Sequence, residues 1–127
     1  MVSTTSGERV LIVEDEPTTR LGLTELVRTW GFITEAAADG EEALQRITAF
    51  RPSIIISDLV MPRMGGRECF RALKALNPDV RAVLCTGYGF NIVAQELLDE
   101  GIVDFLSKPF EPGRLSAVVS RSLSPRR

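Results

Sequence analysis

The feature that most constrains the fold of this chain is a regular alternation between short apolar runs and longer stretches with a helical period. This pattern is typical of a parallel sheet covered by helices on both faces, because such strands are buried on both sides. Five apolar runs predict five strands, at residues 10–13, around Ile33, and at 54–56, 82–84 and 102–106. The runs at 10–13, 54–56 and 82–84 are the most continuous, which predicts that these strands lie centrally in the sheet.

The stretches between the runs have one-sided apolar faces, as amphipathic helices do. The repeating positions are Leu23, Leu26, Val27 and Trp30, then Cys69, Leu73 and Leu76, and finally Leu115, Val118, Val119 and Leu123. Gly31 stands where the first helix is expected to end, and Asp39 with Glu42 forms a capping pair for the second. We therefore expect one (βα)5 domain over residues 9–123, with a flexible segment over 1–8 and a frayed tail over 124–127.

Histidine is absent from the 127 residues, and this narrows the possible chemistry. Without histidine there is no Ser-His-Asp or Cys-His nucleophile, no imidazole-ligated zinc or haem, and no phosphohistidine on this chain. The balance of 15 basic and 17 acidic residues lacks the positive charge that nucleic-acid binding requires. We therefore expect chemistry based on carboxylates, hydroxyls, lysine or thiols, and no direct contact with nucleic acid.

The cysteines and the apolar runs indicate the cellular compartment. Cys69 and Cys85 lie in apolar surroundings without a CxxC spacing, which is typical of core residues in a reduced protein. No apolar run approaches the roughly 20 residues that span a membrane, and residues 1–7 do not resemble a signal peptide. We expect a cytoplasmic protein that does not insert into a membrane.

Polar side chains follow four of the predicted strands, at the edge where parallel sheets bind ligands. Glu14, Asp15 and Glu16 follow the first run, Ser57 and Asp58 the third, Cys85 and Thr86 the fourth, and Ser107 and Lys108 the fifth. Because neighbouring carboxylates repel one another, Glu14, Asp15 and Asp58 favour a hard dication such as Mg²⁺, with water completing its coordination. Lys108 can reach Asp58 or a phosphoryl group on it, and Thr86 adds a hydroxyl. This set of groups suits phosphoryl transfer to an aspartate.

Each of these residues also has a purely structural interpretation. The acidic residues 14–16 could simply cap the first helix, with Pro17 in its first turn. Lys108 could be a solvated loop cation and Thr86 an ordinary strand residue. Phe105, which lies within the fifth apolar run, is suited to be a core aromatic. The acidic turn followed by Asp58 at a neighbouring strand end favours the functional interpretation.

The motifs VLIVEDEP, SDLVMPRMGG, LCTGY and DFLSKPF occur in that order, each at a strand end. With them the chain strongly resembles the receiver domain of two-component response regulators, over nearly all of residues 9–123. The resemblance implies a doubly wound, flavodoxin-like α/β fold, with a five-stranded parallel sheet of order 2-1-3-4-5. It also implies a signalling phosphoacceptor that assists only its own phosphorylation and dephosphorylation, and is not otherwise an enzyme.

The resemblance further implies a role for each matched residue. Asp58 would accept a phosphoryl group from a histidine kinase or a histidine phosphotransfer protein. The implied Mg²⁺ ligands are Asp15, Asp58 and the backbone carbonyl of Val60, with Glu14 bound through water. Thr86 and Lys108 would hold the phosphoryl oxygens. Movement of Thr86 would let Phe105 turn inward, and this would change the surface of the fourth helix, fifth strand and fifth helix that a downstream protein partner binds.

Two further positions concern the lifetime of the phosphoryl group. Val60 and Tyr88 occupy the places that usually flank the path of hydrolytic water, and neither is an acid or an amide. We therefore hypothesise slow hydrolysis of the acyl phosphate.

Two other functions are conceivable for an α/β chain with these residues, and the sequence favours neither. An aspartyl-phosphate phosphatase or phosphotransferase typically needs a second aspartate where Val60 stands. A flavodoxin-like cofactor carrier would place a phosphate against residues 14–16, which would repel it. The short tail after Leu123 fits either a single-domain regulator or the C-terminal receiver of a hybrid sensor kinase.

Overall fold

The computed structural model describes residues 8–58, 66–76, 80–86, 102, 104–107 and 111–123, but not the side chains at 58, 66, 67, 86, 104, 105, 107, 122 and 123. Five parallel strands form one sheet: β1 (Arg9–Val13), β2 (Ile33–Ala37), β3 (Ile54–Asp58), β4 (Arg81–Thr86) and β5 (Asp104–Ser107). Their order is β2-β1-β3-β4-β5, so the predicted order is confirmed and β1, β3 and β4 are central. The described helices are α1 (Pro17–Thr29), α2 (Gly40–Phe50), α3 (Gly66–Leu76) and α5 (Pro112–Leu123).

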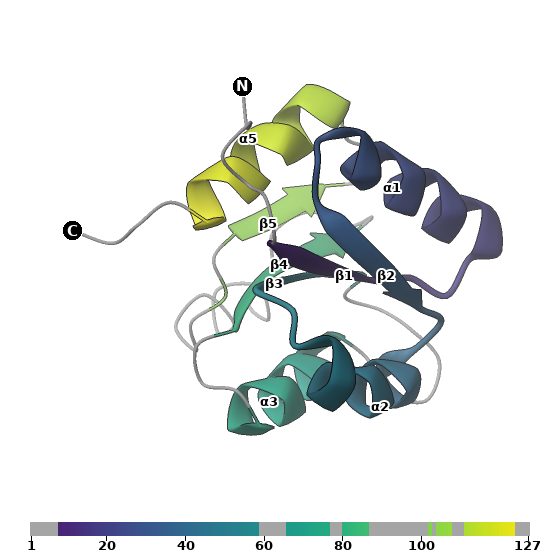
Figure 1. Cartoon of the computed structure of the whole chain (residues 1–127), viewed down its shortest axis with the longest axis vertical. Helices are drawn as coiled ribbons and strands as arrows, with labels where there is room; N and C mark the ends of the chain where they lie inside the picture. The colour runs from purple at the N-terminus through teal and green to yellow at the C-terminus, as the bar shows by residue number, and fades with distance from the viewer. Residues whose placement is uncertain are drawn as a thin grey trace.

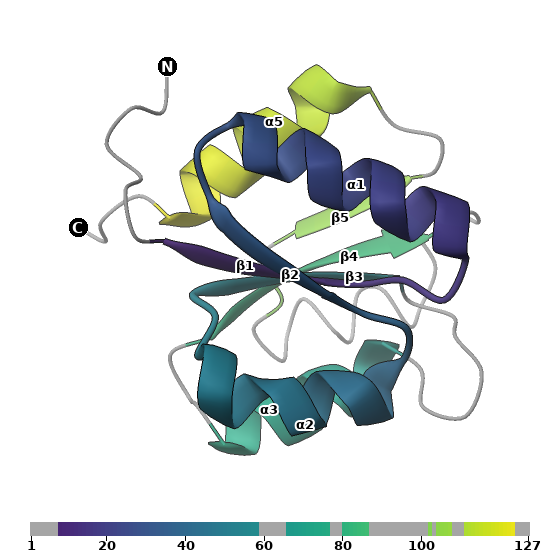
Figure 2. The same cartoon turned by 45° about the vertical axis from the view of Figure 1, so that its right-hand side comes forward.

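The sheet lies between two layers of helices, with α1 and α5 on one face and α2 and α3 on the other (Figures 1 and 2). Alternate residues of β1 divide between these faces: Val10 and Ile12 belong to one core cluster, Leu11 and Val13 to the other. The first cluster includes Leu23, Val27, Leu115, Val118 and Val119 from α1 and α5. The second includes Ala43, Ile47, Phe50, Cys69 and Leu73 from α2 and α3. The doubly wound α/β fold is therefore confirmed.

Helix α1 begins and ends as its sequence predicts. The Glu16 carboxylate caps its first turn by accepting from the Thr19 backbone N–H at 2.7 Å, and Pro17 follows the cap. Leu23 and Val27 are buried, and the half-buried Leu26 and Trp30 pack against the same core. Gly31 adopts a φ of 95°, a left-handed conformation that glycine takes readily, and so ends the helix where predicted.

Helix α2 begins at the predicted capping pair. The Asp39 carboxylate accepts from the backbone N–H of Glu42 at 2.9 Å. The Glu42 carboxylate reaches back to the N–H of Ala38, one residue before the cap, at 2.7 Å. The helix ends at Arg51, a non-glycine residue with a φ of 55°, whose N–H donates to the Ile47 carbonyl.

Two sequence predictions are corrected. The apolar stripe of α3 was expected to include Leu76, but this side chain is 61% exposed, whereas Cys69, Phe70 and Leu73 are buried. Leu76 is the last residue of α3 and lines an open pocket of about 450 Å³ with Ile47, Thr48 and Arg51, so the core does not extend beneath it. Strand β5 begins at Asp104 and not at residue 102, because its ladder with β4 starts at Val83. Ile102 is nevertheless buried.

The predicted burial of the two cysteines is confirmed, and several other predictions fall outside the described residues. Cys69 and Cys85 are buried and form no disulfide, and burial raises the pKa of the Cys69 thiol to about 12. Among the helices described, none has the length and apolar character needed to cross a membrane. Residues 87–101, where the fourth helix is expected, and the terminal segments 1–7 and 124–127 lie outside the described part of the chain.

Candidate functional site

The strand register aligns the carboxyl ends of four strands at one edge of the sheet. Val13 lies opposite Ser57, so Glu14 and Asp58 each stand one residue further along neighbouring strands. Asp58 in turn lies opposite Cys85 of β4. Thr86 lies opposite Ser107 of β5, and Lys108 comes directly after this pair. The register therefore sets Glu14 beside Asp58, Asp58 beside Cys85, and Thr86 beside Ser107.

Among the carboxylates whose side chains are described at this edge, Glu14 is the most enclosed. Its side chain is only 2% exposed, and its backbone N–H extends the pairing of β1 with β2 by donating to the Ala37 carbonyl at 3.1 Å. One carboxylate oxygen, Oε2, accepts from the backbone N–H of Glu16 at 3.2 Å. Ser57 is similarly buried at 2% on β3. A buried carboxylate costs free energy unless hydrogen bonds or a cation compensate it, which makes Glu14 a strong candidate for a functional group.

The three acidic residues of the turn have different environments. Glu16 has a structural role, because its carboxylate caps the first turn of α1. The pKa of Glu16 lies below its ordinary value, mainly because its carboxylate accepts a hydrogen bond from the backbone N–H of Thr19. Asp15 is exposed, and Glu14 is buried beside it. The structure thus separates one helix cap from two carboxylates at the strand end.

Arg20, in the first turns of α1, binds the backbone of this acidic turn. Its guanidinium Nη1 donates to the Glu14 carbonyl at 3.0 Å and to the Asp15 carbonyl at 3.4 Å. The backbone of Arg20 is itself anchored, since its N–H donates to the Glu16 carbonyl and its carbonyl accepts from the Thr24 hydroxyl at 2.7 Å. A positive charge therefore lies beside Glu14 and Asp15, bonded to their backbone.

The other predicted site residues are placed only in part. The backbones of Asp58, Thr86 and Phe105 lie in β3, β4 and β5, and Phe105 is opposite Leu84. Val60, Tyr88 and Lys108 lie outside the described residues. The side chains described do not gather three His, Cys, Asp or Glu groups at one point, and they include only Glu14 and Asp15 of the predicted metal ligands.

Two contributors at this edge are not among the residues predicted from the sequence. Arg20 carried a weak signal: it is a cation on the helix that directly follows the acidic turn. The other is the peptide group between Ala37 and Ala38, which accepts from Glu14 on one side and donates to Glu42 on the other. The capping role of Glu42 was predictable, but its link to Glu14 depends on the pairing of β1 with β2.

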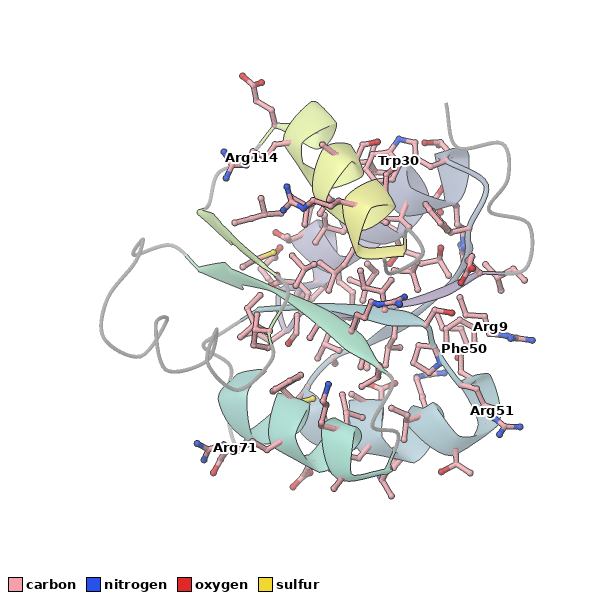
Figure 3. The ribbon with its side chains drawn as sticks, turned by 90° about the vertical axis from the view of Figure 1, so that its left-hand side faces the viewer. Arg9, Trp30, Phe50, Arg51, Arg71 and Arg114 are labelled. Carbon is pink, nitrogen blue, oxygen red and sulfur yellow. The ribbon has the colours of Figure 1, made fainter. Side chains whose placement is uncertain are left out.

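Basic side chains are spread over the molecular surface. Arg9 and Arg51 extend near Phe50 at the amino end of the strands, while Arg71 and Arg114 lie at other parts of the surface (Figure 3). Arg9 and Arg51 are brought to the same end because the N–H of Ser53 donates to the Arg9 carbonyl at 2.8 Å. Arg9 and Arg51 therefore lie at the opposite end of the strands from the acidic turn.

Comparison with known proteins places this architecture in a family. The family model of the response regulator receiver domain matches residues 10–120. The chemotaxis protein CheY of Thermotoga maritima is 28% identical, over 91% of this chain and 97% of its own length. The sporulation initiation phosphotransferase F of Bacillus subtilis is 31% identical, over 92% and 94% respectively.

A solved structure agrees with these relatives. The structure of the CheX-CheY-BeF3-Mg complex from Borrelia burgdorferi has a TM-score of 0.88 and 26% identity, over 98% of this chain and 96% of that one. Neither the phosphatase nor the flavin-carrier alternative is supported by these similarities. With a matching strand order, an acidic turn beside the end of β3, and a family match over most of its length, the chain belongs to the receiver-domain family of two-component response regulators.

Proposed function

We propose that Asp58 accepts a phosphoryl group from a phosphohistidine on a partner protein. A carboxylate oxygen of Asp58 would form a bond to phosphorus as the phosphorus–nitrogen bond breaks, and the imidazole leaves with the donor. The observation that carries this proposal is the register between β1 and β3, which sets Asp58 beside Glu14 and Asp15. Because these 127 residues contain no histidine, the phosphohistidine that donates the phosphoryl group must lie outside them.

The residues present suit a bound Mg²⁺ ion. Glu14 is a buried carboxylate and Asp15 follows it, and both supply the oxygen ligands that Mg²⁺ prefers. Asp15, Asp58 and the Val60 carbonyl would bind the ion directly, and Glu14 would bind through water. When bound, Mg²⁺ supplies positive charge that offsets the phosphoryl oxygens and the carboxylates. Arg20 holds the carbonyls of Glu14 and Asp15 and so keeps the turn in place.

Two residues on the far side of Asp58 would hold the transferred group. Thr86 ends β4, the strand that pairs with β3, and Lys108 follows the end of β5, the strand that pairs with β4. Their hydroxyl and ammonium groups would bind phosphoryl oxygens. Thr86 would then move and let Phe105 turn inward by packing alone, since phenylalanine has no hydroxyl. The surface that changes would comprise the fourth helix, β5 and α5, where a downstream protein binds.

The relatives support the assignment of partners. The Borrelia burgdorferi CheY was solved in a complex with CheX, BeF3 and Mg²⁺. The name of the Bacillus subtilis relative is sporulation initiation phosphotransferase F. These names support a divalent cation, phosphoryl transfer and a protein partner for this chain. A histidine kinase or a histidine phosphotransfer protein would be its donor.

Phosphorylation of the whole chain by a small donor tests the proposal. Incubation with acetyl phosphate and Mg²⁺ should add one phosphoryl group, seen by intact-protein mass spectrometry, and Asp58→Asn should abolish it. Asp39→Asn is the matched control, because asparagine also caps helices well and should leave the adduct unchanged. An unmodified wild-type protein, or an equal adduct on Asp58→Asn, would overturn the proposal.

A further inference from the structure

A single peptide group joins the acidic turn to helix α2. The carbonyl of Ala37 accepts from the backbone N–H of Glu14 at 3.1 Å. The N–H of Ala38 belongs to the same peptide group and donates to Oε1 of Glu42 at 2.7 Å. A trans peptide group is planar, with its C=O and N–H pointing in opposite directions. Glu14, the peptide group and the Glu42 carboxylate therefore form one continuous chain of hydrogen bonds.

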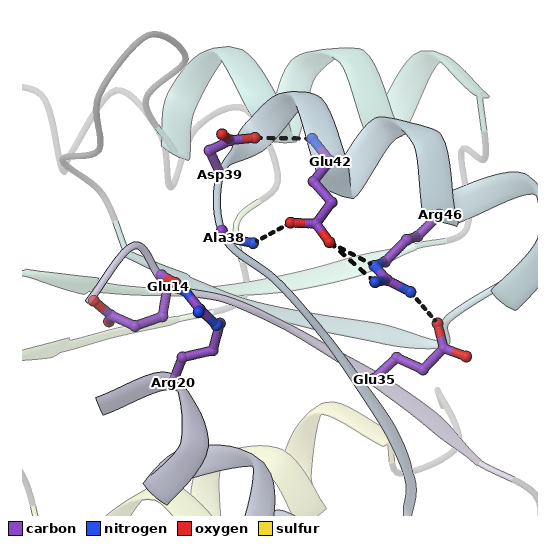
Figure 4. Close-up of polar contacts among 7 residues, drawn as sticks. All are labelled: Glu14, Arg20, Glu35, Ala38, Asp39, Glu42 and Arg46. Carbon is purple, nitrogen blue, oxygen red and sulfur yellow. Dashed lines mark hydrogen bonds and ion pairs between the residues drawn. The ribbon is translucent and has the colours of Figure 1, made fainter. Parts of the chain in front are cut away.

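The Glu42 carboxylate is held at its other oxygen by Arg46 (Figure 4). Arg46 donates to Oε2 from Nη2 at 3.0 Å and from Nε at 3.3 Å, and its Nη1 donates to Glu35 Oε1 at 3.2 Å. Glu35 lies on β2, opposite Leu11 of β1. The backbone N–H of Glu42 is also fixed, by the Asp39 cap. Both the main chain and the carboxylate of Glu42 thus have set positions.

The ion pairs of this network add little to the stability of the fold. The side chains of Glu42 and Arg46 are 36% and 39% exposed, and ion pairs at such exposure contribute little to folding. A charged acceptor does strengthen the hydrogen bond it receives, and it polarises the peptide group so that its carbonyl becomes a better acceptor. The carbonyl at the end of this chain is the one that binds Glu14.

We propose that Glu42, held by Arg46, is a positioning residue for the acidic turn. It fixes the peptide group of Ala37 and Ala38, which fixes the backbone of Glu14 and so presents Glu14 and Asp15 to a divalent cation. This inference rests on the proposed function, because the cation belongs to it. Helix α2 and the edge strand β2 thereby take part in cation binding through their backbone.

The first test follows the Glu14 amide by NMR hydrogen exchange without any metal. Glu42→Ala should speed exchange at Glu14 about three- to tenfold, which corresponds to the net worth of one hydrogen bond. Exchange at Ile12, in the middle of β1, should not change. An equal increase at both amides would show a global loss of stability and would overturn the inference, as would no increase at Glu14.

The second test measures Mg²⁺ binding by calorimetry. Glu42→Ala should weaken binding roughly three- to tenfold, less than the 10- to 100-fold typical of a group that contacts a metal ligand directly. Arg46→Met separates positioning from charge. Removal of a cation would by itself tighten Mg²⁺ binding, because less positive charge would repel the ion. Loss of the hydrogen bonds from Arg46 to Glu42 should instead weaken Mg²⁺ binding. Tighter binding in this variant would overturn the inference.

Matched variants complete the design. Glu42→Gln removes the same charge as Glu42→Ala but keeps an acceptor for Ala38, so it should recover part of the loss, and no recovery counts against the inference. Glu25→Ala removes an exposed glutamate that pairs with Arg28 on α1, and should leave Mg²⁺ binding unchanged. If wild type itself binds no Mg²⁺ and takes no phosphoryl group, the proposed function fails. If wild type does both and Glu42→Ala matches Glu25→Ala, only the positioning role fails.

Discussion

The guanidinium of Arg20 donates to the backbone carbonyl of Glu14 over 3.0 Å, and this contact ties the start of α1 to the end of β1. The same nitrogen reaches the Asp15 carbonyl at 3.4 Å. Arg20 therefore places a positive charge beside the carboxylates of the acidic turn while it supports their backbone. The charge of Arg20 and its support of the backbone matter most when no other cation is bound at the acidic turn.

This arrangement predicts that the contribution of Arg20 depends on Mg²⁺. Arg20→Met should lower the free energy of unfolding by about 1.5 kcal/mol in metal-free buffer, the low end of the range for a hydrogen bond with a charged donor, because the contact is only partly buried. In saturating Mg²⁺ the loss should be smaller, because a bound dication would repel the guanidinium. Urea unfolding with EDTA or with Mg²⁺ measures both values. An equal loss in the two buffers would contradict this explanation.

Much of the fold could be predicted from the sequence because the signals are local. The runs that form β1, β3 and β4 are apolar on both faces, and Glu16, Pro17 and Asp39 act on their own helix ends. The link from Glu14 through Ala37 and Ala38 to Glu42 could not be predicted, since it depends on how two strands pair. Leu76 could not be predicted for a different reason. Helical periodicity shows on which face of the helix a residue lies, but it does not show how far the core extends along that face.

The two leucines of α3 should differ sharply in their effect on stability. Leu73 is 1% exposed in the core, and Leu76 is 61% exposed one turn later. Leu73→Ala should cost about 2–5 kcal/mol of unfolding free energy, because it leaves a cavity among buried side chains. Leu76→Ala should change it by about 0.5 kcal/mol or less. Thermal or urea unfolding measures both variants. Comparable losses would mean that Leu76 is covered in solution.

Stability should fall in acid partly through Glu42. Its pKa lies below the ordinary value of 4.5, first because of the Ala38 N–H and then because of Arg46. The contribution of the carboxylate is therefore present above about pH 4.5 and is lost as the pH falls through its folded-state pKa. Glu42→Gln should show a shallower loss of unfolding free energy than wild type over this acid range. Parallel curves for the two proteins would rule out a contribution from Glu42.

The lifetime of the phosphoryl group should depend on the residue at position 60. Val60 carries no group that can orient a water molecule for attack on phosphorus, so we expect slow hydrolysis in wild type. Val60→Asn should speed hydrolysis by roughly tenfold, well below the 10²- to 10⁴-fold of a full general base, because an amide orients water without accepting its proton. Decay of the phosphorylated mass after removal of the donor measures the rate. Val60→Ala is the control: if it speeds decay as much as Val60→Asn, access of water and not its orientation limits hydrolysis.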